Sequence, residues 1–132
     1  MVKIEALAKF LDCDIEEIFE EGEMLCLGKK EYLVLTDEEA DIKAAEEILE
    51  SAWAFNKGFL DCHSDVISKM PDKSFSKIQE MCENANPIIL ALIQDKDHFV
   101  EDAISCDGRG HFLSRYDSEE NEEGEYFIYR VS

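Results

Sequence analysis

The sequence predicts an α+β domain in which a small antiparallel sheet packs against several helices. Two early apolar runs, Met24–Leu27 and 31–35, flank Gly28-Lys29-Lys30, a pattern typical of a β-hairpin. The last stretch, 125–131, is rich in aromatic and β-branched residues and predicts a further strand. Helical patterns fill the chain between these strands, and neither a repeat nor a linker interrupts it. Residues 1–132 are therefore expected to form a single domain.

The N-terminal segment predicts two short helices. The first carries apolar residues at helical spacing, namely Ile4, Leu7, Ala8 and Leu11. Asp14 stands where it would cap the second helix, which would run through Ile15, Ile18 and Phe19. Glu21-Gly22 then breaks the pattern.

A longer helix is predicted after the hairpin. Thr36 and Glu39 have the spacing of a capping box, and the helix is expected to run to about Ala54. One face would carry Ile42, Ala45, Ile48, Leu49, Ala52 and Trp53. The opposite face is acidic, with Lys43 among its carboxylates at a distance of four residues from both Glu39 and Glu47.

Shorter helices are predicted in the second half of the chain. The first is a piece at 59–63, after Asn56-Lys57-Gly58. Ser74 and Asn86-Pro87 are the expected caps of two more, and Asp95 or Asp97 is expected to start a helix that faces inward through Phe99, Val100, Ala103 and Ile104. Asp107-Gly108-Arg109-Gly110 would end that helix, and 119–124 would form a solvated hairpin loop.

Acidity is the dominant chemical feature of the chain. The formal net charge is −19, from 13 Lys and Arg against 32 Asp and Glu, and the first 50 residues hold 16 of the acidic residues but only 5 of the basic ones. A field of this sign repels nucleic acid phosphates and anionic membranes. It attracts basic proteins, metal cations and the protein grooves that normally hold nucleic acid.

The first two predicted helices have the spacing of a helix-turn-helix motif, but their charge excludes the usual function of that motif. Asp12 stands where the turn prefers glycine, and the would-be recognition helix carries four carboxylates, at Glu16, Glu17, Glu20 and Glu21. These would oppose the phosphate contacts that dominate DNA affinity. Direct nucleic acid binding is rejected.

No metal or other cofactor is expected. The acidic run that starts at Asp117 has glycine at its eighth position, where an EF-hand has it at the sixth, and Ile128 at the twelfth, where an EF-hand needs glutamate. The five cysteines are scattered without a CxxC pair, which indicates free thiols in a reducing cytoplasm rather than a zinc cage. Neither a signal peptide nor an apolar run of membrane-spanning length is apparent.

One segment of the chain carries residue types that an enzyme would use. Asp107-Gly108-Arg109-Gly110-His111 is the densest cluster of catalytically useful residue types, and Cys106 beside it is a conceivable nucleophile. The favoured interpretation is structural: a helix end at Gly108, an arginine paired with carboxylates and a partly buried histidine. No catalytic residue is assigned.

The acidity suggests a binding surface. Carboxylates four residues apart on a helix are separated by about 6 Å along its axis, close to the spacing of successive phosphates on one DNA strand, and such an array fits a groove lined with Lys and Arg. The alternative is that the acidity serves solubility alone. The candidate partner-binding residues are Asp14, Glu16, Glu17, Glu20, Glu21 and Glu23, then Glu46 and Glu50, and then Asp117, Glu119 and Glu120 within the loop that ends at Glu125.

Several segments resemble a group of small acidic, uncharacterised bacteriophage and prophage proteins. They are 35–41 (LTDEEAD), Trp53-Ala54-Phe55-Asn56 with Phe59-Leu60, 108–117 (GRGHFLSRYD) and 126–130 (YFIYR), and Ser118 stands where the group has glycine. The resemblance implies action in a bacterial host cytoplasm. By analogy with other small acidic phage proteins, we expect an inhibitor of the anti-CRISPR or anti-restriction type that mimics nucleic acid. The alternative is a phage adaptor that binds a host protein through an apolar patch, for example at Tyr126 or Tyr129.

Overall fold

The computed structural model describes residues 1–132, and the chain forms two compact units. The first unit combines Met1–Ala44 with Asp107–Ser132, and the second is Ala45–Cys106. The first holds the sheet and the second is helical, so the predicted α+β class is confirmed. Each unit is described by itself below, and the expectation of a single domain stays a prediction.

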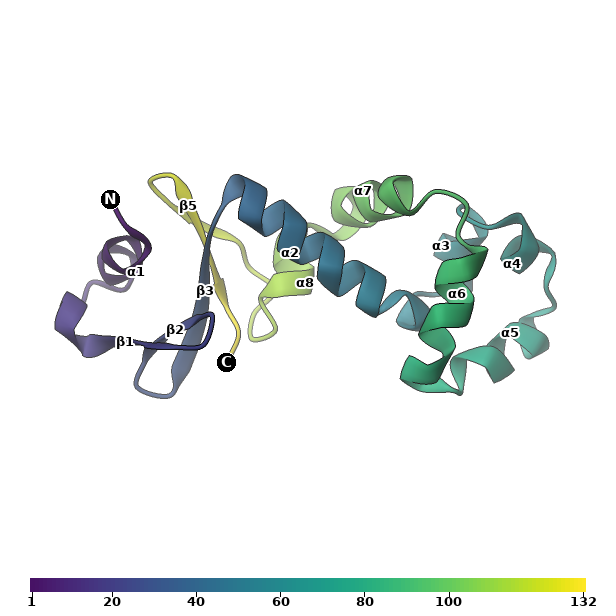
Figure 1. The fold of residues 1–132 in the computed structure, drawn as a ribbon, viewed down its shortest axis with the longest axis horizontal. Helices are drawn as coiled ribbons and strands as arrows, with labels where there is room; N and C mark the ends of the chain where they lie inside the picture. Colours follow the sequence, from purple (N-terminus) through teal and green to yellow (C-terminus); the bar gives the residue numbers. More distant parts are fainter. The chain divides into compact units, whose positions relative to one another are not determined.

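The sheet of the first unit has five antiparallel strands (Figure 1). They are β1 (Ile18–Glu21), β2 (Met24–Leu27), β3 (Lys30–Thr36), β4 (Asn121–Glu123) and β5 (Tyr126–Arg130), in the spatial order β1-β2-β3-β5-β4. The predicted hairpin is confirmed as β2 and β3, and the glycine of its turn, Gly28, has a φ of 62°. The predicted C-terminal strand is β5, which pairs with β3 from Tyr32↔Arg130 to Thr36↔Tyr126.

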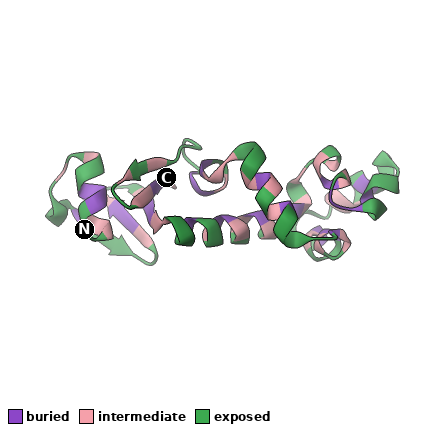
Figure 2. Cartoon of the chain, turned by 90° about the horizontal axis from the view of Figure 1, so that it is seen from above, coloured by how far each residue is buried: buried purple, intermediate pink, exposed green.

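Helix α1 (Lys3–Leu11) covers one face of this sheet. The two elements share a core made of Ala6, Leu7, Ala8, Ile18, Leu25, Tyr32, Val34 and Ile128, and Figure 2 shows buried residues on both. The opposite pleat is also covered, because Cys26, Leu33 and Tyr129 are buried there. Tyr129 is fully buried, so its suggested role as an exposed aromatic contact is wrong.

The predicted second helix of the N-terminal segment is wrong. Residues Ile15–Glu17 form a single 3-10 turn, and Ile18 begins β1. The physical reason lies in β2, whose edge pairs with β1 from Ile18↔Leu27 to Glu21↔Met24 across a tight turn at Gly22, where φ is 63°. Ile15 is exposed and Ile18 is buried, so the two residues do not share an apolar helix face. No helix-turn-helix motif is present.

Acidic residues mark both edges of the sheet. The edge strand β1 carries Glu20 and Glu21. The other edge strand, β4, carries Glu122 and Glu123 and corrects the expectation that 119–124 is only a loop. Charged edge residues oppose the pairing of one sheet edge with another molecule.

Helix α2 (Asp37–Glu50) begins as predicted and ends earlier. The Glu39 N–H donates to Thr36 Oγ1 at 3.2 Å and the Thr36 N–H donates to Glu39 Oε1 at 2.9 Å, which confirms the capping box. After Glu50 the chain tightens into the 3-10 turn η2 (Ala52–Ala54). Ile42, expected to face inward, is 62% exposed, because the buried stripe is made of Ala40, Ala44 and Ile48.

The segment after α7 (Lys96–Asp107) holds a further helix that the sequence pattern did not predict. Gly108, with a φ of 83°, ends α7 as expected, and α8 (Arg109–Leu113) follows at once. Gly110 on α8 is buried, and a Cβ there would lie 2.6 Å from the Ser118 carbonyl oxygen. The close approach of the 118–120 backbone therefore requires glycine at position 110.

The second unit is a set of short helices: α3 (Lys57–Asp61), α4 (Asp65–Lys69), α5 (Asp72–Gln79), the 3-10 turn η3 (Cys82–Ala85), α6 (Asn86–Leu92) and most of α7. Ser74 is not a cap, because α5 already begins at Asp72, after Pro71. Asn86 is the first residue of α6 rather than its cap. Its side chain donates to the Leu49 carbonyl at 2.8 Å and accepts from the Trp53 N–H at 3.0 Å.

The cysteines divide between the units. Cys13 is half-buried and Cys26 is buried, and both belong to the first unit. Cys62, Cys82 and Cys106 are exposed and all belong to the second. None of the eight helices combines the length and the apolar character needed to cross a bilayer.

Candidate functional site

The first unit holds most of the negative charge. It contains 20 of the 32 acidic residues and 8 of the 13 basic residues, a balance of −12. Six of these carboxylates form ion pairs with a lysine or arginine: Glu23, Asp37, Glu39, Asp41, Glu120 and Glu123. The other fourteen have no ion pair, and all of them except the half-buried Glu31 are exposed.

Six of the unneutralised carboxylates follow one another along the segment 12–21. They are Asp12, Asp14, Glu16, Glu17, Glu20 and Glu21, and every one is exposed. The segment starts with Asp12 in the left-handed conformation, continues through the 3-10 turn and ends in β1. We call this segment, residues 12–21, the acidic arm.

The predicted helical spacing of the acidic arm is wrong. Neighbouring residues of a strand point to opposite faces, so Glu20 lies on the pleat of Ile18 and Glu21 on the pleat of Phe19. The regular i, i+4 spacing holds for Glu46 and Glu50, which lie on the real helix α2 in the second unit and are both exposed.

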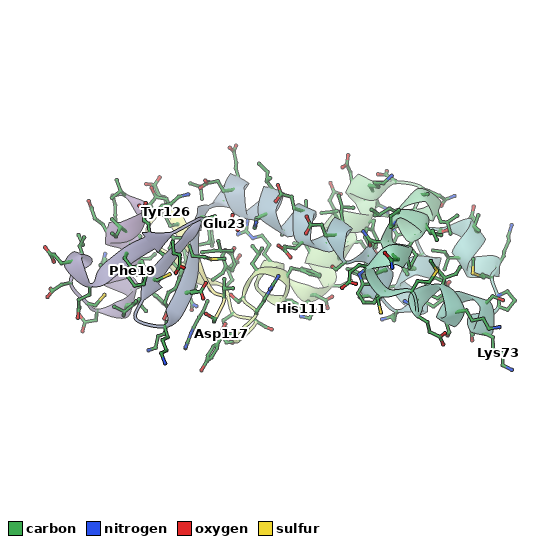
Figure 3. The ribbon with its side chains drawn as sticks, turned by 60° about the horizontal axis from the view of Figure 1, so that its bottom comes forward. Phe19, Glu23, Lys73, His111, Asp117 and Tyr126 are labelled. Carbon is green, nitrogen blue, oxygen red and sulfur yellow. The ribbon has the colours of Figure 1, made fainter.

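Of the candidate residues predicted in the loop that starts at Asp117, two bond to other residues of the fold. Asp117, labelled in Figure 3, accepts the Glu119 N–H on Oδ1 at 3.0 Å. Glu120 accepts from Arg109 and from the Tyr129 hydroxyl, so its carboxylate is a structural partner rather than a free charge. Glu119 has no ion pair and is exposed.

Arg109 joins three acidic side chains and an aromatic ring. Its Nη1 donates to Asp37 Oδ1 at 2.9 Å and to Asp41 Oδ1 at 3.0 Å, and its Nε donates to Glu120 Oε1 at 2.8 Å. The guanidinium carbon lies 4.7 Å from the centroid of the Phe127 ring. Burial lowers the pKa of Arg109, but the hydrogen bonds to Glu120 and Asp37 outweigh it and raise the pKa above its usual value. Burial and the Glu120 carboxylate also raise the pKa of Tyr129.

The residues of the enzyme alternative have separate surroundings. The Nε and Nη1 of the Arg109 guanidinium bond to the carboxylates named above. His111, labelled in Figure 3, is exposed against the Phe112 ring. Cys106 belongs to the second unit, where its Sγ lies 3.8 Å from Asp102 Oδ1. The bonds of Arg109 to three carboxylates support its structural interpretation.

A histidine–aspartate pair forms the polar centre of the second unit. His63 Nε2 lies 2.7 Å from Asp102 Oδ2, and the His63 side chain is 2% exposed. Phe59 and Phe99 surround the imidazole, with ring centroids at 5.2 and 5.4 Å from it. The carboxylate stands between Cys106 and the histidine, whereas a nucleophilic triad needs the histidine between the other two groups. The pair is a structural contact between a buried imidazole and a half-buried carboxylate.

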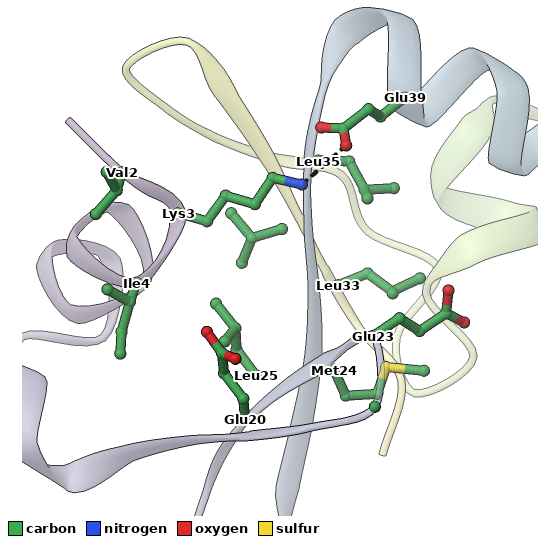
Figure 4. A pocket seen from close by; sticks show the side chains of 12 residues that line it. Val2, Lys3, Ile4, Glu20, Glu23, Met24, Leu25, Leu33, Leu35 and Glu39 are labelled. Carbon is green, nitrogen blue, oxygen red and sulfur yellow. Dashed lines mark hydrogen bonds and ion pairs between the residues drawn. The ribbon is translucent and has the colours of Figure 1, made fainter.

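A cleft opens at one end of the sheet in the first unit (Figure 4). It has a volume of about 500 Å³, within the range of small-ligand sites. Its apolar lining is made of Val2, Ile4, Met24, Leu25, Leu33, Val34 and Leu35. Its charged lining is made of Lys3, Glu20, Glu23 and Glu39, and Lys3 is joined to Glu39 at 2.9 Å.

This cleft was not predicted from the sequence. One signal was present: the second predicted strand extends further than its hairpin partner, so part of it has no neighbour on that side. The segment that closes the cleft, β1, was assigned to a helix, and the contact of Lys3 with Glu39 spans 36 positions. No group of three or more His, Cys, Asp or Glu side chains lies where it would hold a metal ion.

Comparison with known proteins gives no relative. No protein-family model matches the chain, and neither the curated proteins nor the solved structures include one with significant similarity.

Proposed function

We propose that the protein is an acidic binding protein that occupies the basic, nucleic-acid-binding surface of another protein and excludes nucleic acid from it. The observation that carries the proposal is the set of fourteen carboxylates in the first unit that have no ion pair. A basic partner supplies the cations that the fold lacks. When it binds, counterions are released from the carboxylates of this protein, as they are from the phosphates of DNA.

The acidic arm is the favoured contact. Its six exposed carboxylates lie within ten residues, and none of them is used to bind another element through an ion pair. Their spacing is irregular, so the proposal depends on the density of charge rather than on a helical copy of the phosphate repeat. Such a surface favours fast association that weakens with salt.

The resemblance to small acidic phage and prophage proteins suggests the class of target. Restriction nucleases and CRISPR effectors both carry basic grooves that hold DNA or RNA, and a phage gains from blocking either. The proposed activity is therefore inhibition of a host defence nuclease in the bacterial cytoplasm.

DNA cleavage by a panel of purified restriction and CRISPR nucleases, measured with increasing amounts of the protein, tests the proposal. We expect at least one nuclease to lose DNA binding competitively. The concentration for half-inhibition should rise at least about ten-fold between 50 and 200 mM salt, because several charge contacts are lost together. Inhibition that leaves DNA binding intact, or whose half-inhibition concentration does not change with salt, would contradict the proposal.

A pair of matched four-site variants locates the contact. The first replaces Glu16, Glu17, Glu20 and Glu21 with glutamine, and the second replaces the exposed Glu80, Glu83, Asp97 and Glu101 of the second unit with their amides. Both change the net charge by four, so equal losses of inhibition would assign the effect to net charge alone. A loss confined to the first variant would support the acidic arm.

A specific observation favours a second candidate, a phage adaptor that binds through an apolar patch. Ile15 and Phe19 of the acidic arm are 43% and 49% exposed, so two large apolar side chains reach solvent among its carboxylates. Replacing both with serine leaves every carboxylate in place. Loss of partner binding in that variant, with the charge variants still active, would favour the adaptor.

A further inference from the structure

Strand β3 extends beyond its partner on one side. Its pairing with β2 ends at Leu25↔Tyr32, while its pairing with β5 continues to Thr36↔Tyr126. Residues 33–36 therefore have a neighbouring strand on the β5 side only. The other side of this stretch faces the cleft, which Leu33, Val34 and Leu35 line.

The backbone of Val34 points to this open side. The Val131 N–H donates to the Glu31 carbonyl at 2.8 Å, and the Glu31 N–H donates to the Ser132 carbonyl at 3.2 Å, so Glu31 directs its polar groups toward β5. The direction alternates along an antiparallel strand, so Leu33 and Leu35 also bond toward β5. Val34 directs its N–H and C=O the opposite way, past the end of the paired part of β2.

Neighbouring elements leave these two groups without a partner. The residue of the β1–β2 turn that would face Val34 in a longer hairpin is Glu23, and no backbone hydrogen bond joins the two. Val34 is 3% exposed. A buried peptide group without a partner is costly, and a ligand with matching backbone groups would remove that cost.

The charges around the cleft define what fits it. Three carboxylates and one lysine line it, within a unit whose balance is −12. Glu39 is paired with Lys3 and Glu23 with Lys43, whereas Glu20 has no ion pair. The floor between these charges is apolar.

We propose that the cleft binds an extended segment of another protein, with apolar side chains alternating with lysine or arginine, which adds as a short strand to β3 at Val34. The backbone of the segment would bond to the N–H and C=O of Val34, its apolar side chains would cover Met24 and Leu33 on one face, and a basic side chain would reach Glu20 on the other. This is recognition by strand addition. It shares only Glu20 with the proposed inhibition of nucleases, which depends on charge density and not on the rest of this cleft.

The test uses the intact protein and a capped seven-residue peptide of alternating lysine and valine. Backbone N–H groups alternate between the two edges of a strand, so two further peptides carry N-methyl groups on all valines or on all lysines. Charge and side chains are the same in all three. We expect one methylated peptide to bind at least about ten-fold more weakly than the parent, because it loses the N–H groups of the binding edge, and the other to bind as the parent does.

Amide hydrogen exchange gives a second readout. In the free protein the Val34 amide should exchange faster than those of Leu33 and Leu35, and the parent peptide should slow it at least about ten-fold by providing an acceptor. Glu20→Gln should weaken the peptide several-fold more than Glu16→Gln, which removes the same charge outside the cleft. Equal binding of all three peptides, equal effects of the two substitutions, or an unchanged Val34 amide would overturn strand addition and leave only charge attraction.

Failure here and failure of the nuclease proposal are distinguishable. Loss of strand addition leaves nuclease inhibition intact, and absence of nuclease inhibition leaves the Val34 exchange result unchanged.

Discussion

Arg109 and Asp37 lie 72 positions apart in the sequence, and the Nη1 of one lies 2.9 Å from the Oδ1 of the other. The same nitrogen also donates to the Asp37 carbonyl at 3.0 Å, within the first turn of α2. Asp41 and Glu120 complete the set of acceptors. One largely buried guanidinium, 11% exposed, therefore joins the first turn of α2, α8 and the segment before β4.

Replacement of Arg109 by alanine should lower the free energy of unfolding by about 2–4 kcal/mol, because it leaves three neighbouring carboxylates without a cation. Arg109→Lys should recover only part of the loss, since one ammonium cannot reproduce the planar fork. Urea unfolding measures both. Lys29→Ala, which removes the same charge from an exposed turn, is the control, and an equal effect there would contradict the prediction.

Replacement of Gly110 by alanine should destabilise the first unit by about 1–3 kcal/mol, because the new Cβ overlaps a tightly packed backbone. That Cβ would meet the Ser118 carbonyl oxygen at 2.6 Å and the Glu119 carbonyl carbon at 2.9 Å. Gly58→Ala is the matched control, since its nearest neighbour is the Asn56 side chain at 3.4 Å. Thermal unfolding should show a lower Tm for the first variant only.

Ser118 has a φ of 60°, a conformation that favours glycine. Ser118→Gly should stabilise the protein by about 0.5–1 kcal/mol. This is the difference between two effects: glycine removes the backbone strain of the folded state, but it also increases the conformational entropy of the unfolded chain. Ser105→Gly, in the regular helix α7, should have the opposite sign and a similar size. A destabilising effect of Ser118→Gly in chemical denaturation would show that the turn is unstrained.

The His63–Asp102 contact should stabilise the second unit. Asp102→Ala leaves the buried imidazole without its partner and should cost about 1–2 kcal/mol in urea unfolding. Asp102→Asn keeps an acceptor at the same place and should cost less. Glu101→Ala, an exposed neighbour on the same helix, controls for the change in charge and helix propensity.

Stability should depend on pH through Glu39. The hydrogen bond from the Thr36 N–H, with a further one from Lys3, lowers the pKa of the Glu39 carboxyl below its usual value. A lowered pKa stabilises the fold above the unfolded value, about 4.3, and this contribution is lost as the pH falls through the folded pKa. Glu39→Ala should therefore cost about 0.5–1 kcal/mol at pH 7, where solvent screens the exposed pair, and less at pH 3. Urea unfolding at the two pH values measures this, and Glu38→Ala should have no such pH-dependent cost.

The elements that the sequence predicted are those with a local cause. Thr36 and Glu39 are three residues apart and specify the start of α2 by themselves. Gly28 likewise specifies the turn of the central hairpin. The exposure of the candidate residues of the acidic arm also has a local cause, because a run of carboxylates is costly to remove from water.

The features that the sequence did not predict depend on distant partners. Ile15 and Ile18 have helical spacing, and only the edge of β2 converts the second of them into the start of a strand. Ile42 is exposed because the contacts of α2 use Ala40 and Ala44 instead. The sequence predicted that Arg109 pairs with carboxylates, but not that Asp37 and Asp41 are among them, because they lie 72 and 68 positions away. The cleft joins three separate segments within the first 39 residues, which no periodicity within one segment can indicate.

The distribution of the cysteines has a practical consequence. Burial raises the pKa of the Cys26 thiol, and burial together with the carboxylates of Glu17, Asp14 and Asp12 raises that of Cys13. Thiolate is the reactive form, so these two thiols react slowly with maleimides. Cys62, Cys82 and Cys106 are exposed in the second unit. A fluorophore or spin label added to the unaltered protein therefore attaches to one unit alone, and the unit that carries the acidic arm stays chemically intact while its partners are sought.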